Sequence, residues 1–218
     1  MAFLQRFSII IITVIAIGFA AIVFAYKLAT RSNLEEGTTD YSNLLQNEVS
    51  IYRNQFGIPH IVASTEQDVY FSLGYAHAQD RLWQMDFLRR VGGGQLSEVM
   101  GIETIEAERF FRVVGIGRIA DNLVRSLSKQ SIQALESYTR GVNCYITNQS
   151  NKYPFEFDAL HYKPQPWKVS DCLVIERLMA FDMSMSFWTD IAIGEIADSL
   201  GVDEAIKFIP EYPPNAPT

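Results

Sequence analysis

The stretch GYAHAQDRLWQMDFLRR, from Gly74 to Arg90, shapes how the rest of this 218-residue chain is interpreted. Apolar residues recur in it every three or four positions and continue a pattern that begins at Val69. This period predicts an α-helix, and the apolar stripe is too wide for a helix on the surface, so we expect most of its length to be enclosed. The GGG at residues 92–94 is expected to end the helix.

The charged residues of this stretch need partners. Asp86 stands four positions before Arg90, the favourable order for a helical ion pair, which contributes roughly 0.3 kcal/mol if exposed. Asp80 and Arg81 have mainly apolar neighbours. Burying either unpaired would cost several kcal/mol by order of magnitude, so each is expected to have a partner. His77 is interpreted as a structural residue, with a small hydrolase using His77 and Asp80 as a weaker alternative.

Outward from this helix, the pattern predicts one hairpin and several more helices. Two short β-type runs at 49–53 and 59–63 flank NQFG, whose Gly57 can supply the positive φ of a turn. Helical periodicity recurs near 105–114, 119–127, 131–148 and 170–187, and a last short helix is expected near 195–208 after a glycine-containing join. Helices therefore dominate the predicted fold.

The N-terminus has the composition of a membrane segment. FSIIIITVIAIGFAAIVFAY, from Phe7 to Tyr26, carries no charge and as a helix would span about 30 Å, the thickness of a bilayer core. We expect an uncleaved anchor within residues 1–30 and an extracytoplasmic domain, in the periplasm or at the cell exterior; a cleaved signal and a secreted protein is the alternative. A polar linker (31–47), a domain (48–209) and a Pro-rich tail (210–218) follow.

Composition and motifs exclude several classes of function. The net charge of -7, without a basic run, argues against a nucleic-acid surface. Cys144 and Cys172 fit no metal motif and are either a disulfide or two small buried residues. The three histidines form no zinc-binding pair. Neither a G-x-S-x-G elbow nor a Walker loop is present.

One remaining route is a nucleophile whose own α-amine is the base, freed by cleavage that often follows a Gly. The only Gly followed by Ser, Thr or Cys is Gly37, before Thr38, in the polar linker. We therefore expect no competent nucleophile in this chain.

Several motifs stand in the order of one family. GIPHI (57–61), GYAHAQDRLWQM (74–85) and RRVGGGQLSE (89–98) are followed by GVNCYI (141–146) and PFEFDALHYKPQPWKVSD (154–171). From about Glu48 to near its end, the chain resembles the N-terminal α segment of the penicillin acylase family of N-terminal nucleophile hydrolases. The resemblance implies an α+β fold in which this chain supplies the mainly helical part of an αββα sandwich.

In that family a precursor is cut, and a Ser freed at the head of a β segment hydrolyses a linear side-chain amide, as in penicillins or acyl-homoserine lactones. No cofactor takes part in catalysis. This sequence lacks a β segment, so the resemblance implies that the chain alone is inactive and that its partner is the β segment of the same precursor or of a neighbouring gene. The alternative is an inactive, membrane-anchored remnant or partner-binding protein.

The resemblance also implies site residues within this chain. Counting from Trp167 places the acyl-pocket positions at Ala180, Met183 and Ser184, although Met183 fits a core position equally well. Some members bind a structural Ca²⁺ through one carboxylate of this segment. The same register places that carboxylate at Asp190, for which a solvated helix-end residue is the alternative.

Overall fold

The structure is a computed structural model that describes residues 17–20, 22–23, 26, 37–148, 153–184 and 186–209. The chain divides into two compact units, Met1–Ile175 and Glu176–Thr218. Most of the predicted membrane stretch from Phe7 to Tyr26 lies outside the described residues. Within the described part, no helix combines the length and the apolar character needed to cross a membrane.

The predicted hairpin is present in the first unit. Strands β1 (Ser50–Arg53) and β2 (Pro59–Val62) pair antiparallel, with Ser50 opposite Val62. The turn is fixed by Asn54, whose Oδ1 accepts hydrogen bonds from the backbone N–H groups of Phe56 and Ile58, and by Gly57 at φ 76°. Pro59, which has no N–H to donate, stands at the start of its strand.

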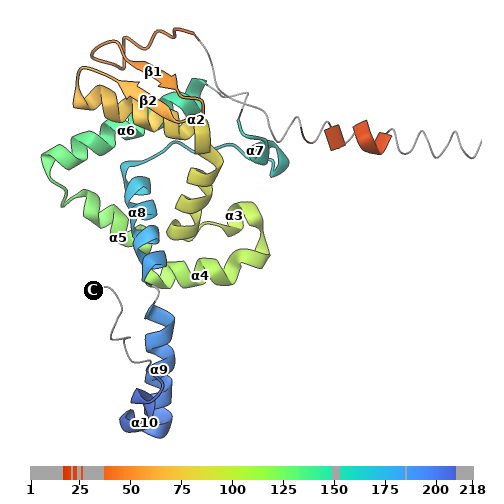
Figure 1. Ribbon diagram of the computed structural model, residues 1–218, viewed down its shortest axis with the longest axis vertical. Coiled ribbons are helices and arrows are strands. Elements are labelled where there is room, and N and C mark those ends of the chain that lie inside the picture. Colours follow the sequence, from red (N-terminus) through yellow and green to blue (C-terminus); the bar gives the residue numbers. More distant parts are fainter. Residues whose placement is uncertain are drawn as a thin grey trace, which may run out of the picture. The chain divides into compact units, whose positions relative to one another are not determined.

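The predicted helix around Gly74–Arg90 is α2 (Glu66–Gly93), the spine of the first unit (Figure 1). Thr65 caps its start by accepting a hydrogen bond from the N–H of Asp68. Gly94, in the left-handed conformation at φ 66°, ends it as the GGG sequence predicts. Arg81 has non-helical angles (φ -141°, ψ 23°), and Figure 1 shows the two arms of α2 running in different directions on either side.

Helix α6 (Lys129–Asn148) packs against α2 through two glycines. A Cβ atom on Gly74 would lie 2.1 Å from the carbonyl oxygen of Tyr138, and one on Gly141 would lie 1.9 Å from that of Phe71. Each helix thus presents a glycine where the backbone of the other passes. This close contact builds the core, which consists of Ala78, Leu82, Met85, Val142, Tyr145, Ile146, Phe157 and Trp167.

Shorter elements complete the two units. The first contains α3 (Ser97–Met100), η1 (Ile102–Thr104), α4 (Ile105–Val114), α5 (Ile116–Val124), α7 (Phe155–Ala159) and the start of α8 (Val169–Met183). The second contains the end of α8, α9 (Ser186–Leu200) and α10 (Val202–Ile206).

Three helix boundaries differ from the prediction. Helix α5 begins at Ile116, not at 119, because Gly115 (φ 80°) already separates it from α4. Helix α8 ends at Met183, before the predicted 187. The helix predicted for 195–208 is wrong: Gly194 is not a join but lies inside α9, and the break falls at Gly201 (φ 92°).

Candidate functional site

The carboxylate of Asp86 is the centre of a buried charge network. Asp86 is 0% exposed. Its Oδ1 accepts from Nε of Arg89 at 2.9 Å, and its Oδ2 accepts from Nε of Arg90 at 2.9 Å and from the hydroxyl of Tyr162 at 2.8 Å. The predicted Asp86–Arg90 pair is therefore present, but it is buried and shared with Arg89 and Tyr162, so the energy given for an exposed pair does not apply.

Arg89 extends this network to the segment that leads into α8. Its Nη1 donates to Asp171 at 2.9 Å, and its guanidinium also donates to the backbone carbonyls of Gln165 and Pro166. The same group lies 4.9 Å from the centre of the Trp167 ring. Since Asp171 belongs to the first turn of α8, Arg89 fixes the start of that helix against α2.

Arg90 completes the network on the other side. Its Nη1 donates to Glu98 of α3 at 2.9 Å, and its guanidinium lies 5.2 Å from the centre of the Tyr162 ring. Burial, and the neighbouring Asp86 carboxylate, raise the pKa of Tyr162 well above its usual value. The phenol therefore remains a hydrogen-bond donor, as Asp86 requires.

A second charge cluster joins the hairpin to α2. Arg53 of β1 donates to both oxygens of Asp80, at 3.0 and 2.7 Å, and also to Gln79 at 2.9 Å. The prediction that Asp80 has a partner is confirmed. The prediction for Arg81 is wrong: at the kink of α2 its side chain is exposed, and none of the described residues forms an ion pair with it.

The geometry of His77 does not fit the alternative hydrolase. Its Nδ1 lies 3.0 Å from the hydroxyl oxygen of Tyr138, while the Asp80 carboxylate is held by Arg53. Burial lowers the pKa of His77, with the charge of Asp80 acting in the opposite direction. The imidazole is therefore neutral at pH 7 and hydrogen-bonded, which matches a structural role.

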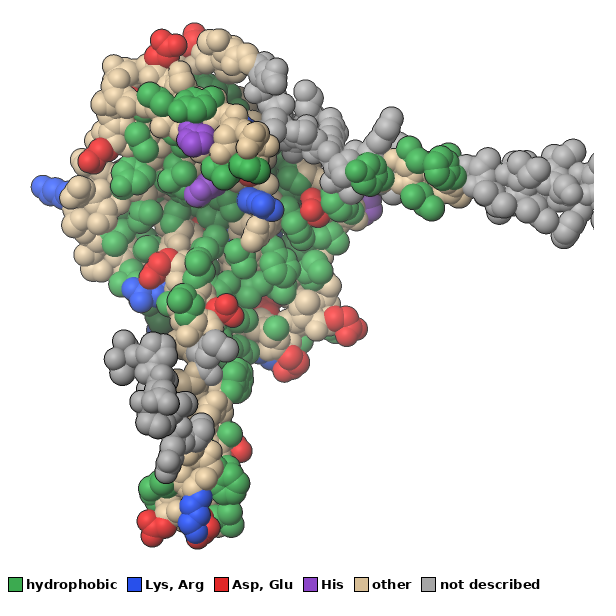
Figure 2. All heavy atoms as spheres, viewed as in Figure 1, with side chains coloured by type: hydrophobic (Ala, Val, Ile, Leu, Met, Phe, Trp, Pro, Cys, Tyr) green, Lys and Arg blue, Asp and Glu red, His purple; other side chains and the backbone are tan. Residues whose placement is uncertain are grey.

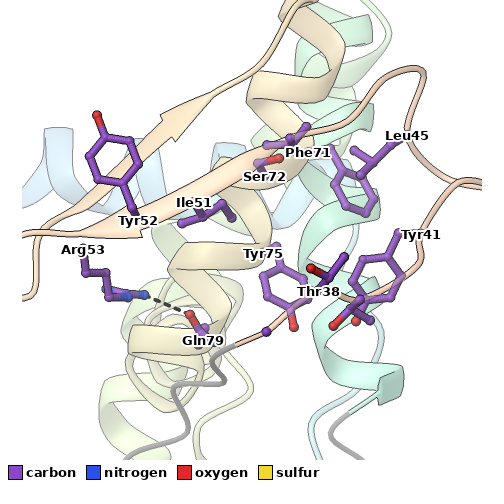
Figure 3. A pocket seen from close by; sticks show the side chains of 13 residues that line it. Thr38, Tyr41, Leu45, Ile51, Tyr52, Arg53, Phe71, Ser72, Tyr75 and Gln79 are labelled. Carbon is purple, nitrogen blue, oxygen red and sulfur yellow. Dashed lines mark hydrogen bonds between the residues drawn. The ribbon is translucent and has the colours of Figure 1, made fainter.

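The described residues also line an open cavity of about 780 Å³ (Figure 3). Its walls are the segment from Gly37 to Leu45, strand β1 and the first arm of α2. In Figure 3 the rings of Tyr41 and Tyr75 approach each other from two of these walls, with 5.9 Å between their centres. Four aromatic rings line the cavity together with polar groups such as Ser72 and Gln79, a composition common in ligand-binding cavities.

The predicted acyl-pocket residues lie together at the end of α8. Ala180, Met183 and Ser184 are exposed, and the Ser184 hydroxyl donates to the carbonyl of Ala180 at 2.9 Å. Met183 is 79% exposed, so the alternative core position does not hold for the described residues. These three residues can line a pocket only together with another surface, and their role stays a prediction.

Asp190 is exposed on α9. Across the described ranges, no three His, Cys, Asp or Glu side chains are grouped so that they could hold a metal ion. The Ca²⁺ site at Asp190 therefore stays a prediction that needs ligands from outside these residues.

Both cysteines are free, so the disulfide alternative is wrong. Cys144 is buried, whereas Cys172 is half-buried and accepts a hydrogen bond from the indole N–H of Trp167 at 3.3 Å. Burial raises the pKa of each thiol, which makes both poor nucleophiles at neutral pH.

The family model described as Penicillin amidase matches residues 48–216, most of the chain. This chain belongs to the penicillin amidase family. The acyl-homoserine lactone acylase QuiP of Pseudomonas syringae pv. tomato is 36% identical over 177 residues, covering 81% of this chain and 21% of that protein. The penicillin acylase 2 proenzyme of a Pseudomonas species is 34% identical over 140 residues, covering 64% of this chain and 18% of that protein.

A solved structure supports the same fold. A chain of the thermostable penicillin G acylase from Alcaligenes faecalis matches with a TM-score of 0.64 at 23% identity, covering 78% of this chain and 95% of that one. The present chain thus spans about a fifth of the length of the curated relatives it matches, yet nearly all of one polypeptide in a solved acylase.

The order of the family motifs can be predicted from the sequence, but the contacts between them in the penicillin amidase fold cannot. Arg89 and Asp171 come from two of those motifs and form one network with Asp86, which directly follows the motif at 74–85. The spacing of the acidic and basic residues along α2 predicts ion pairs, but it does not indicate that these side chains are buried. Tyr162 stands in the motif at 154–171, but its place there does not mark it as the partner of Asp86, which it reaches from the segment after α7.

Proposed function

We propose that this chain is the α part of a penicillin-acylase-like amidohydrolase, and that a β segment supplies the nucleophile. The observation that carries the proposal is the ordered set of family motifs over residues 48–216, whose charged residues converge on Asp86. In this sequence Gly37, in the polar linker, is the only Gly followed by Ser, Thr or Cys, which supports the proposal that the nucleophile comes from another segment.

The proposed reaction cleaves a linear amide between an acyl group and an amine. The hydroxyl of the β-segment N-terminal Ser attacks the amide carbonyl while the α-amine of the same residue takes its proton. The amine product then leaves with that proton, and water hydrolyses the acyl ester to a carboxylic acid. Donors in the β segment hold the oxyanion of each tetrahedral intermediate.

Acyl-homoserine lactones are the preferred substrate class in this proposal, with penicillins as the second. The name of the QuiP relative at 36% identity supports the first, and that of the penicillin acylase 2 proenzyme at 34% supports the second. In both, the bond to be cut is a linear amide. The chain would contribute Ala180, Met183 and Ser184 to the wall that contacts the acyl group, and Asp190 to a structural Ca²⁺ site.

The proposed setting is extracytoplasmic. The uncharged stretch from Phe7 to Tyr26 supports a membrane anchor, or a signal segment if it is cleaved. The β segment would complete the αββα sandwich to which this chain brings its helices.

The test is to produce the full chain with and without a matching β segment and to follow hydrolysis of a chromogenic aryl-acetamide and of a long-chain acyl-homoserine lactone. We expect turnover only from the pair, and none when the β-segment N-terminal Ser is replaced by Ala. Equal activity from the chain alone would contradict the proposal. A pair that associates without turnover would instead favour the alternative, an inactive partner-binding remnant.

Met183 offers a test of the acyl-pocket assignment within the same assay. Met183→Trp should shift the preference toward shorter acyl chains, because a larger side chain fills the pocket. Met179→Trp, on the same helix and also exposed, is the matched control and should leave the preference unchanged. The same shift in both variants would contradict the assignment of Met183 to the acyl pocket.

A further inference from the structure

The first attachment of the residues from Gly37 to Asn47, here called the strap, is to one buried carboxylate of the domain. Asp68 of α2 is 2% exposed. It accepts hydrogen bonds from the backbone N–H groups of Gln46 at 2.8 Å and Asn47 at 3.1 Å, and from the Thr65 hydroxyl at 2.8 Å. Burial raises the pKa of Asp68, but these hydrogen bonds outweigh it and hold the pKa below its usual value. The carboxylate is therefore charged at neutral pH, the form that two N–H donors favour.

The second attachment of the strap lies beside a thiol. The Tyr41 hydroxyl accepts from Nδ2 of Asn148 in α6 at 3.0 Å, and the same Nδ2 lies 3.3 Å from Sγ of Cys144. Cys144 is only 6% exposed. The phenol of Tyr41 thus lies beside the thiol, at the seam between α2 and α6.

The strap is held by polar contacts more than by packing. None of its residues is buried, and Tyr41, Leu44 and Leu45 are only partly covered. Tyr41, Leu45 and the residues near Gly37 nevertheless form one wall of the 780 Å³ cavity, opposite Ser72 and Tyr75 of α2 (Figure 3). A segment with so little buried apolar surface is expected to open locally at a far lower cost than the core.

We propose that the strap is a releasable cover whose latch is Asp68. In the closed state the strap walls the cavity and shields the thiol of Cys144. In the open state the hydrogen bonds from residues 46 and 47 to Asp68 are broken, Tyr41 leaves the α2–α6 seam, the cavity loses one wall, and the thiol becomes accessible. This cover is independent of the proposed acylase activity, which would depend on the other end of the chain.

Peptide-resolved alkylation of the full-length chain with iodoacetamide tests the latch, because each cysteine is measured in the same sample. Asp68→Asn replaces one carboxylate oxygen by an NH₂ donor, which cannot accept the hydrogen bond that a backbone N–H of the strap now donates there. Losing hydrogen bonds to a charged group should speed Cys144 alkylation by roughly tenfold or more. The rate at Cys172 should not change. Asp40→Asn is the matched control: it removes the same charge from a strap carboxylate that accepts from the N–H of Ser42 within the strap, and should change neither rate.

A second variant leaves α2 untouched. Gln46→Pro removes one of the two backbone donors to Asp68 from the strap side and should also speed alkylation of Cys144 alone. Selective acceleration at Cys144 in this variant supports the latch even if Asp68→Asn unfolds the domain. Protection of Cys144 that survives Gln46→Pro, or equal acceleration of both cysteines in both variants, would overturn the proposal.

Discussion

At the scale of single residues, the buried carboxylate of Asp86 is shared between two arginines. It pairs with both Arg89 and Arg90 and accepts the hydroxyl of Tyr162, while each arginine has a second carboxylate, Asp171 or Glu98. A buried ion pair adds little net stability compared with a well-packed apolar substitute, but removing one partner leaves the other charge buried and unpaired. The network therefore acts mainly through specificity: it admits only the arrangement in which α2, α3 and the start of α8 meet.

Asp86→Ala should accordingly destabilise the chain strongly. We expect the free energy of unfolding to fall by about 3–5 kcal/mol, the cost of stranding a buried charge. Urea denaturation followed by tryptophan fluorescence measures this. Arg109→Gln is the control, since the Arg109–Glu106 pair is 71% and 79% exposed and should contribute less than about 1 kcal/mol. Similar losses in both variants would show that the network does not hold the fold.

At the scale of elements, the seam between α2 and α6 depends on two glycines that approach the opposite backbone. Gly74→Ala would place a methyl group 2.1 Å from a backbone carbonyl oxygen, which cannot rotate away. We expect the helices to separate and the unfolding free energy to fall by about 3 kcal/mol or more, at the upper end of overpacking effects.

The control for that prediction lies in α9. Gly194 is helical, and a Cβ atom there would meet nothing within 4 Å. Gly194→Ala should therefore be neutral or stabilise its helix by up to about 1 kcal/mol, because alanine has the higher helix propensity. In thermal melts, Gly74→Ala should lower the unfolding midpoint relative to the wild type, and Gly194→Ala should not. A Gly74→Ala chain as stable as wild type would contradict the close packing.

The same elements show what the sequence can predict. Local patterns were sufficient to predict the hairpin and α2, because turn residues and the spacing of apolar residues depend only on neighbours in the sequence. The join placed at Gly194 failed because glycine is tolerated in a helix when nothing else interrupts it. The burial of Asp86 could not be predicted for another reason. The residues that surround it, Tyr162 and the partners of Arg89, are distant from it in the sequence.

At the scale of the whole molecule, large apolar side chains remain exposed in both units. In the first unit these include residues of the hairpin, and Figure 2 shows hydrophobic side chains gathered over much of the face turned to the viewer. In the second unit Met183 and Trp188 are 79% and 62% exposed. Patches of this kind commonly mark protein interfaces. This agrees with a chain that spans about a fifth of its curated relatives and that, as proposed, functions with a partner segment.

Helix α9 provides the sharpest test of that view, because none of its residues is buried. A helix of this length whose residues are at most half-buried, against the short helix α10, is marginal in water, so in the chain alone its amides should exchange with solvent much faster than those of α6. Adding the matching β segment should slow exchange in α9 by roughly tenfold or more, as apolar side chains such as Trp188 become covered, and should leave α6 almost unchanged. Hydrogen–deuterium exchange with mass spectrometry measures both helices in one sample. If α9 is already as protected as α6 in the isolated chain, its exposed face needs no partner and the proposed docking of a β segment there is wrong.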